Sequence, residues 1–217
     1  MCSSDLPARF LIRARLGPHR RGLRDPGICI HGSWGVRLDS TAVLACGHSL
    51  ESKMSTKLIS WWKQFRPTAC SVKLKAEDKH GVLGEIVSNL VSAGLLDAQL
   101  EETALRTLTS REEVASTGIG MGVAIPHVKI DGIEEAICCL SVHKAGIDWA
   151  AVDGGPVQVL FMVLRPSEAT DKYDPEEHLA MMRWVAGLAR NRDFRSFACQ
   201  AQTRTDLVDL LKEMSST

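Results

Sequence analysis

The sequence has no net charge, no long apolar run and no paired-cysteine motif, and each absence removes a class of function. Lysine plus arginine and aspartate plus glutamate each number 26, so no overall field attracts nucleic acid or an anionic membrane. The longest apolar stretches, such as Val157 to Leu164, fall far short of the roughly 20 residues that cross a bilayer. We therefore expect a soluble protein that neither binds nucleic acid nor inserts into a membrane.

The seven cysteines are odd in number, scattered along the chain and free of CxxC or CxxH spacing. This usage favours a reducing compartment, and we expect a cytoplasmic location. Cys138 and Cys139 are neighbours in an apolar run, and on a strand they face opposite sides of the sheet. They cannot hold one metal together in regular geometry, so both are expected in the core. His80 and His143 have no companions at ligand spacing, and we expect neither a metal nor a cofactor.

The composition changes near Met54. Residues 1–53 are rich in arginine, contain one lysine, Lys53, and show no helical or alternating periodicity. Their aspartates and few serines argue against an organelle transit peptide, and they lack a secretory apolar segment. Two interpretations remain: a disordered arm that binds a partner, or, as we prefer, translation that begins at Met54. We expect residues 54–69 to be an N-terminal linker and residues 70–217 to be one domain.

Helical and strand patterns alternate after residue 78. Capping residues and apolar stripes predict a helix capped by Asp78 that ends at Gly94, and others over 97–108, from Asp174-Pro175, and after a Thr205 cap. Short apolar runs predict strands at 123–125, 136–142 and 157–164. The helix after Asp174 is expected to bury Leu179, Met182, Val185, Ala186 and Ala189. This alternation predicts an α/β sandwich.

His127 follows a short apolar run and Pro126, which places it at the end of a strand. A neutral imidazole is abundant near pH 7 and offers a lone pair without a separate base, so it suits reversible phosphoryl carriage. Transfer also needs donors for the three equatorial oxygens of the phosphoryl group. The candidates are a fork from Arg111, the hydroxyl of Thr117, backbone amides at Gly118, Gly120 and Gly122, and a second imidazole on His178.

Each of these residues also has a purely structural interpretation. A lone histidine after Ile-Pro is more often hydrogen-bonded for structure than functional. Arg111 suits the closing of a helix end, where it would meet free carbonyl groups. Thr117 suits a turn, and His178 suits an exposed position in the first turn of a helix. Residue types alone therefore leave both interpretations open.

A longer pattern favours the functional one. Arg111-Glu112, then Ser116-Thr117-Gly118-Ile119-Gly120, then Val123-Ala124-Ile125-Pro126-His127 resembles the phosphorylation-site signature of fructose/mannitol-type IIA domains of bacterial phosphotransferase systems, including the nitrogen-regulatory IIA proteins. The resemblance continues through Ile147-Asp148-Trp149, the turn and strand Asp153-Gly154-Gly155-Pro156-Val157, and His178-Leu179. It covers roughly residues 70 to 217 and implies a mixed β-sheet flanked by helices.

The resemblance implies that His127 accepts phosphate from a histidine phosphocarrier protein, that Arg111 is the site arginine, and that His178 lies beside the phosphorylated ring. The chain would then be a phosphotransferase component that carries phosphohistidine. Two positions depart from the family pattern: Val128, where the family usually has a small residue, and Met121, between two glycines. Val128 either crowds the acceptor edge of the ring or packs elsewhere.

Three outputs remain open. With no attached sugar-permease or IIB-like segment in the sequence, we favour the nitrogen-regulatory type, whose partners would be the carrier protein and regulated target proteins. A sugar-specific IIA for fructose or mannitol transport, with a IIB partner, is the near alternative. The third is an interaction module that keeps the fold without the phosphoryl chemistry.

Overall fold

The computed structural model describes residues 60–215. The predictions for residues 1–53, and for the beginning of the expected linker, lie outside that range. The rest of the expected linker is folded, because Trp61–Gln64 and Pro67–Ala69 form short 3-10 helices and the Phe65 side chain is 1% exposed. These residues pack against the sheet and add to the core ahead of residue 70.

Residues 60–215 contain one mixed sheet built around strand β5, Val157–Pro166. β2 (Val123–Ala124) and β3 (His127–Ile130) lie end to end along one edge of β5, both parallel to it. β4 (Ile137–Ile147) pairs antiparallel with β5, and β1 (Gly118–Gly120) pairs antiparallel with β2. The predicted mixed sheet is thus confirmed, and the new strand β3 places His127 in it.

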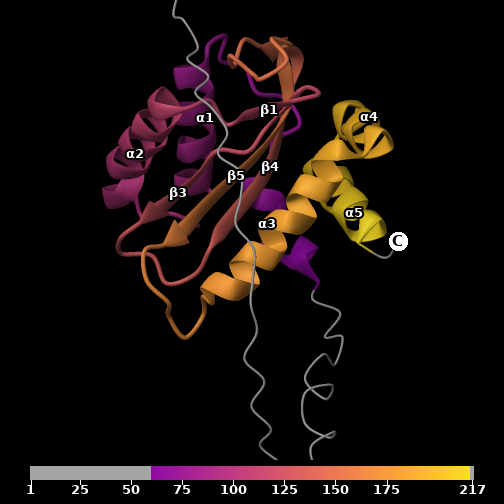
Figure 1. The fold of residues 1–217 in the computed structure, drawn as a ribbon. Coiled ribbons are helices and arrows are strands. Elements are labelled where there is room, and N and C mark those ends of the chain that lie inside the picture. Colours follow the sequence, from indigo (N-terminus) through magenta and orange to yellow (C-terminus); the bar gives the residue numbers. More distant parts are fainter. Residues whose placement is uncertain (1–59, 216–217) are drawn as a thin grey trace, which may run out of the picture. The chain divides into compact units, whose positions relative to one another are not determined.

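Helices cover both faces of the sheet (Figure 1). α1 (Lys79–Ser92) and α2 (Glu101–Val114) lie over one face. On the other face lie α3 (Pro175–Arg190), α4 (Arg192–Gln200) and α5 (Arg204–Met214). A 3-10 turn, Ala98–Leu100, leads into α2.

The helix starts follow local hydrogen bonding. The Asp78 carboxylate accepts from the amide of Gly81 at 2.7 Å, as the predicted cap of α1 requires. The prediction that Thr205 caps the last helix was wrong by two positions. Thr203 is the cap, because its hydroxyl accepts from the amide of Asp206 while the Asp206 carboxylate accepts from the amide of Thr203. α4 was not predicted.

The sheet separates two apolar cores. Val128, Cys139 and Leu160 point toward α1 and α2, whereas Cys138 and Val163 point toward α3 to α5. The two adjacent cysteines therefore face opposite sides of the sheet, as their neighbouring positions predicted. Burial raises the pKa of both thiols, to about 12 for Cys138. Such thiols are inert parts of the core.

The buried side of α3 differs from the prediction. Met181 and Leu188 are buried together with the predicted Val185 and Ala189, whereas the predicted Met182 and Ala186 are only half-buried. Leu179 is 52% exposed, so its predicted burial was wrong. The helix meets the sheet along the i, i+4, i+7 row that begins at Met181, which leaves Leu179 on the solvent side.

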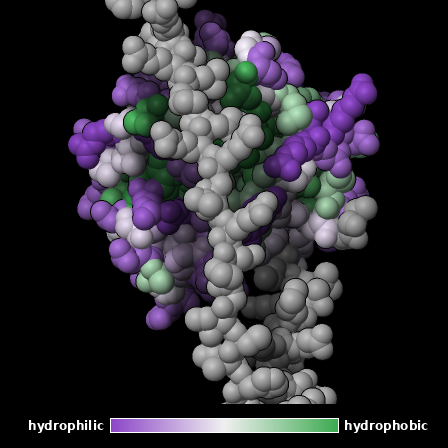
Figure 2. All heavy atoms as spheres, in the orientation of Figure 1, coloured by the Kyte–Doolittle hydropathy of each residue, from purple (hydrophilic) through white to green (hydrophobic). Residues whose placement is uncertain are grey.

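Hydrophilic side chains dominate the visible rim of the molecule on this side, and hydrophobic ones show mainly nearer its centre (Figure 2). Among residues 60–215, none of the helices combines the length and the apolar character that a membrane span needs.

Candidate functional site

His127 opens β3 directly after the break between β2 and β3. Its ring Nδ1 lies 2.8 Å from the carbonyl oxygen of Ile125. Because a carbonyl only accepts, Nδ1 must carry the proton of a neutral ring, and the lone pair is then on Nε2. The side chain is half-buried. The Ile125 carbonyl therefore orients an imidazole that the core does not seal.

His178 lies in the first turn of α3, where its amide donates to the carbonyl of Asp174 at 2.9 Å. Burial is the main reason that the pKa of the His178 ring falls to about 4, and the electrostatic influence of Arg165 and His127 contributes to the same shift. The ring is neutral at pH 7 for that reason. Its Nδ1 is buried without a hydrogen-bond partner among residues 60–215. His127 is thus close enough to His178 to influence its pKa.

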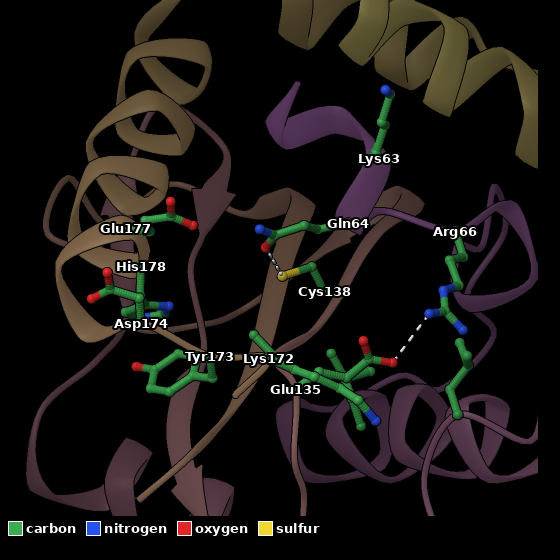
Figure 3. Close-up of a pocket in the computed structure, with 13 residues that line it drawn as sticks. Lys63, Gln64, Arg66, Glu135, Cys138, Lys172, Tyr173, Asp174, Glu177 and His178 are labelled. Atoms are coloured by element: carbon green, nitrogen blue, oxygen red, sulfur yellow. Dashed lines mark hydrogen bonds and ion pairs between the residues drawn. The ribbon is translucent and has the colours of Figure 1, made fainter. Parts of the chain in front are cut away.

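A cavity of about 200 Å³ lies beside His178. Figure 3 shows His178 and Tyr173 near the first turn of α3 at this cavity. The Tyr173 ring lies 5.7 Å from the His178 ring, centroid to centroid, at an interplanar angle of 57°. Tyr173 is itself buried, so it fixes one side of the His178 ring.

Val128 is 6% exposed and packs in the core against α1 and α2. Neighbouring strand residues face opposite sides of a sheet, so its side chain points away from the face that carries the His127 ring. The departure at Val128 is therefore a packing feature and leaves the acceptor edge of His127 open.

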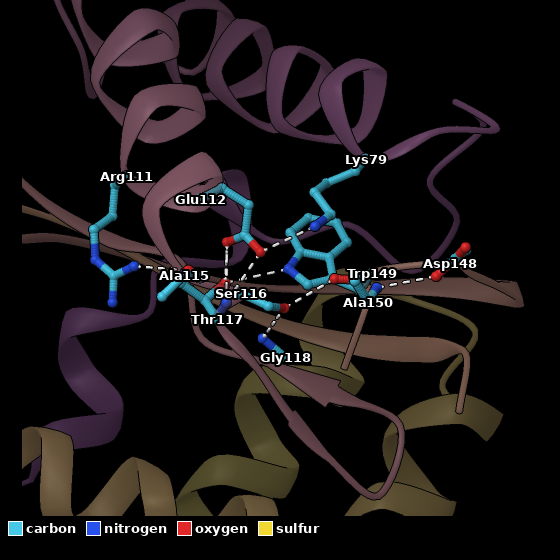
Figure 4. Close-up of polar contacts among 10 residues, drawn as sticks. All are labelled: Lys79, Arg111, Glu112, Ala115, Ser116, Thr117, Gly118, Asp148, Trp149 and Ala150. Carbon is cyan, nitrogen blue, oxygen red and sulfur yellow. Dashed lines mark hydrogen bonds and ion pairs between the residues drawn. The ribbon is translucent and has the colours of Figure 1, made fainter. Parts of the chain in front are cut away.

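Arg111 and Thr117 have structural partners (Figure 4). Arg111, in the last turn of α2, donates from Nη1 to the carbonyl of Ala115 at 2.8 Å. The Thr117 hydroxyl donates to a Glu112 carboxylate oxygen at 2.5 Å and accepts from the Trp149 indole at 3.2 Å. Its only proton is thus already used. In this state Arg111 closes a helix end, which is the structural role that its position also predicted.

Glu112 is a buried carboxylate that the sequence did not single out. It accepts from the amide of Thr117 at 3.0 Å and forms an ion pair with the Lys79 ammonium at 3.2 Å. The Lys79 ammonium also lies 5.5 Å from the Trp149 ring centroid. These contacts tie α1 and α2 to the start of β1 and to the loop after β4, next to Arg111 (Figure 4).

The three glycines predicted to cradle phosphate lie farther away. Gly122 precedes His127 by five residues on the same edge of β5, which is roughly 16 Å at the rise of a strand. Gly118 pairs with Ala124, three residues before His127. A Cβ on Gly118 would meet the Ala151 backbone at 2.9 Å, and one on Gly120 would meet the Asp153 carboxylate at 3.0 Å. The structure does not bring these glycines to His127.

Two positive side chains at the site were missed. Lys129 and Arg165 are direct partners across β3 and β5, and they lie two residues beyond His127 and Val163 respectively. Arg165 was available as a signal in the sequence, because it interrupts the apolar run of its strand. Arg165 comes close to His127 only because β3 and β5 pair, and the local sequence pattern does not specify that pairing.

A mixed sheet between two helical layers carries one imidazole at the start of β3, and the first turn of α3 carries a second, neutral one. The chain belongs to the family described as phosphoenolpyruvate-dependent sugar phosphotransferase system, EIIA 2, whose model matches residues 63–214.

Its relatives include both regulatory and transport proteins. A nitrogen regulatory protein of Pseudomonas aeruginosa is 34% identical over 152 residues, which cover 69% of this chain and 93% of that protein. A fructose-specific EIIA component of Haloferax volcanii is 30% identical over 136 residues, which cover 63% of this chain and 84% of that protein. The crystal structure of nitrogen regulatory protein IIA-Ntr from Neisseria meningitidis shares the fold, with a TM-score of 0.61 at 23% identity, covering 69% of this chain and 97% of that one.

Proposed function

We propose that His127 accepts a phosphoryl group on Nε2 from a phosphohistidine of a histidine phosphocarrier protein. The observation that carries this proposal is the 2.8 Å contact between His127 Nδ1 and the Ile125 carbonyl. It commits one ring nitrogen to donating and leaves the other as the nucleophile, so no separate general base is needed.

In the transfer step, the Nε2 lone pair forms an N–P bond while the N–P bond of the donor breaks, and the electron pair of that bond stays on the donor ring. The protein then contributes positioning and charge stabilisation. His178 is neutral because burial lowers its pKa to about 4. A neutral imidazole has one N–H donor and one acceptor nitrogen, so His178 can form a hydrogen bond with the incoming group. It stays neutral at pH 7 while it does so.

Arg111 keeps its place in the proposal as a donor that turns toward the phosphoryl group when it arrives. α2, which carries it, packs against β3, and its guanidinium donates to a neutral acceptor, the Ala115 carbonyl. A phosphoryl dianion offers that guanidinium a stronger, charge-assisted partner.

For the output, we propose the nitrogen-regulatory type, in which the phosphorylated and unphosphorylated forms bind different target proteins in the cytoplasm. The 34% identity to a nitrogen regulatory protein over 93% of its length supports this choice. A sugar-specific IIA that passes the group to a IIB component is the second candidate, favoured by the 30% identity to a fructose-specific EIIA component.

The test is phosphate incorporation. The protein is incubated with the general phosphotransferase proteins and labelled phosphoenolpyruvate. We expect an acid-labile, base-stable label that disappears in His127→Ala and persists in His80→Ala, a control at an exposed histidine on α1. A wild-type protein that takes up no label would overturn the proposal and favour a pure interaction module. Labelled protein offered to a IIB component then separates the two outputs, because only a transport IIA passes the label on.

A further inference from the structure

Lys129 and Arg165 place two positive charges on the face of the sheet that carries His127. In the parallel pair of β3 and β5, His127 lies opposite Val163 and Lys129 lies opposite Arg165. Val163 belongs to the core under α3, while Val128 and Leu164 belong to the opposite core. Alternation along each strand therefore puts His127, Lys129 and Arg165 on the α3 side.

The distance is short enough for contact with a group on His127. The Cα of Arg165 is one strand across and two residues along from that of His127. This separation is roughly 8 Å, given strands about 4.8 Å apart and a rise of about 3.3 Å per residue. An arginine side chain spans most of that gap, and a phosphoryl group on Nε2 covers part of the remainder.

Within the described part of the chain, no carboxylate forms an ion pair with Lys129 or Arg165. Arg165 is half-buried, and its recorded hydrogen bonds run from Nη1 to the Tyr173 hydroxyl at 3.2 Å and to the Pro166 carbonyl at 3.4 Å, both neutral acceptors. Like charges directly opposite each other across two strands destabilise a sheet. Such a pair is explained if an anion occupies the space between them for part of the working cycle.

The surroundings hold the guanidinium toward the histidines. The Tyr173 hydroxyl binds Arg165, and the Tyr173 ring packs against the His178 ring with centroids 5.7 Å apart. Arg165 and His127 both act electrostatically on His178, so the guanidinium and the two imidazoles share one neighbourhood. Because His178 is neutral, it adds no further charge to this group.

We propose that Arg165 binds the oxygens of the phosphoryl group on His127, with Lys129 as the second cation, in addition to or in place of Arg111. The inference rests on the proposed phosphorylation of His127. A guanidinium offers a planar fork that matches phosphate geometry, and the ammonium of Lys129 supplies charge from the next strand. The dianion neutralises the Lys129–Arg165 repulsion, so the phosphorylated form gains a contact that the free form lacks.

The experiment compares wild type, Arg165→Gln, Arg165→Lys and a matched control, Arg190→Gln. Arg190 is exposed at the far end of α3, twelve residues after His178 and roughly 18 Å along the helix. The initial rate of labelling from a limiting amount of phosphorylated carrier is measured for each. We expect Arg165→Gln to slow labelling roughly 100-fold, the loss typical when a donor to transition-state charge is removed. Arg165→Lys should recover part of the rate, and the control should match the wild type.

A second readout separates phosphate binding from a structural role. Thermal midpoints are measured for the free and the phosphorylated form of each protein. We expect phosphorylation to raise the midpoint in wild type and in Arg190→Gln but not in Arg165→Gln. If Arg165 has only a structural role, Arg165→Gln should lower the thermal midpoints of the free and phosphorylated forms by the same amount. The rise on phosphorylation would then stay as large as in wild type, and that result would overturn the inference.

The outcomes distinguish the two levels of the proposal. An unlabelled wild type removes the phosphorylation of His127 and the role of Arg165 with it. A labelled wild type with an equally fast and equally stabilised Arg165→Gln removes only the role of Arg165. If Arg165→Gln does not fold, the folded Arg165→Lys decides, since its weaker fork must still reduce the midpoint rise.

Discussion

The lowered pKa of His178 makes stability fall in acid, and a substitution that removes the titrating ring should remove this contribution. Burial, aided by Arg165 and His127, lowers that pKa from 6.5 to about 4. The unfolded chain therefore takes up a proton as pH falls through 6.5, while the folded chain resists until about pH 4. Stability is fully present above the unfolded value and is lost between these two values as pH falls.

The magnitude follows from the same shift. At about pH 5, a fully shielded ring with this shift would cost the folded state roughly 2 kcal/mol relative to neutral pH. The His178 ring is only half-buried, and solvent screens part of the effect, so we expect about 1 kcal/mol. In His178→Gln this loss should be absent. The variant should therefore show a free energy of unfolding that changes less between about pH 7.5 and about pH 5 than the wild-type value does.

Urea unfolding at the two pH values measures the difference. Hydrogen bonds lower the pKa of the Asp153 and Asp206 carboxyls, so these groups also contribute stability that is lost in acid. That contribution is the same in the wild type and in His178→Gln. The control is His80→Gln at an exposed ring. Its free energy of unfolding should change with pH as much as the wild-type value does. An unchanged slope in His178→Gln, or an NMR titration of His178 centred near 6.5, would refute the assignment of a buried neutral ring.

Three further substitutions test other parts of the site. Arg111→Ala should slow labelling of His127 at least tenfold. Its free energy of unfolding should fall by less than about 1 kcal/mol, since the lost hydrogen bond has a neutral acceptor. Comparable losses in the labelling rate and in stability measured by urea unfolding would speak against a transfer role. Glu112→Ala should lower the free energy of unfolding by about 3 kcal/mol, because it leaves the partly buried Lys79 ammonium unpaired; a double substitution with Lys79→Met should recover part of it. Val128→Ala should cost about 1 to 3 kcal/mol through a core cavity with an unchanged labelling rate, and faster labelling would revive the crowding hypothesis.

Local signals predicted the parts of the fold that depend on neighbours in the sequence. The Asp78 cap and the opposite faces of Cys138 and Cys139 follow from backbone hydrogen bonding or alternation over a few residues, whereas His127, expected to end a strand, begins the unpredicted strand β3. The cap and the cysteine faces need no information from the rest of the chain. Leu179 shows the limit, because the face that α3 buries is chosen by the sheet it meets.

The candidate site depends on long-range contacts that local patterns do not specify. His127 on β3 is close enough to His178 on α3 to influence its pKa. The glycines are close to His127 in sequence, but Gly122 precedes it by five residues along the edge of β5. Gly118 and Gly120 lie beside the loop that includes Ala151 and Asp153. Arg165 reaches His127 only through parallel pairing. Such long-range register is specified by the whole sheet and not by the local pattern.

The interruption between β2 and β3 has a consequence for how this surface tolerates change. The group that fixes the His127 tautomer is the carbonyl of Ile125, and every amino acid at that position supplies the same oxygen. Side chains around the ring can therefore change without altering the orientation of the ring. An exposed side chain such as Leu179, next to His178, can therefore change to fit a new partner while the His127 ring still presents the same nitrogen.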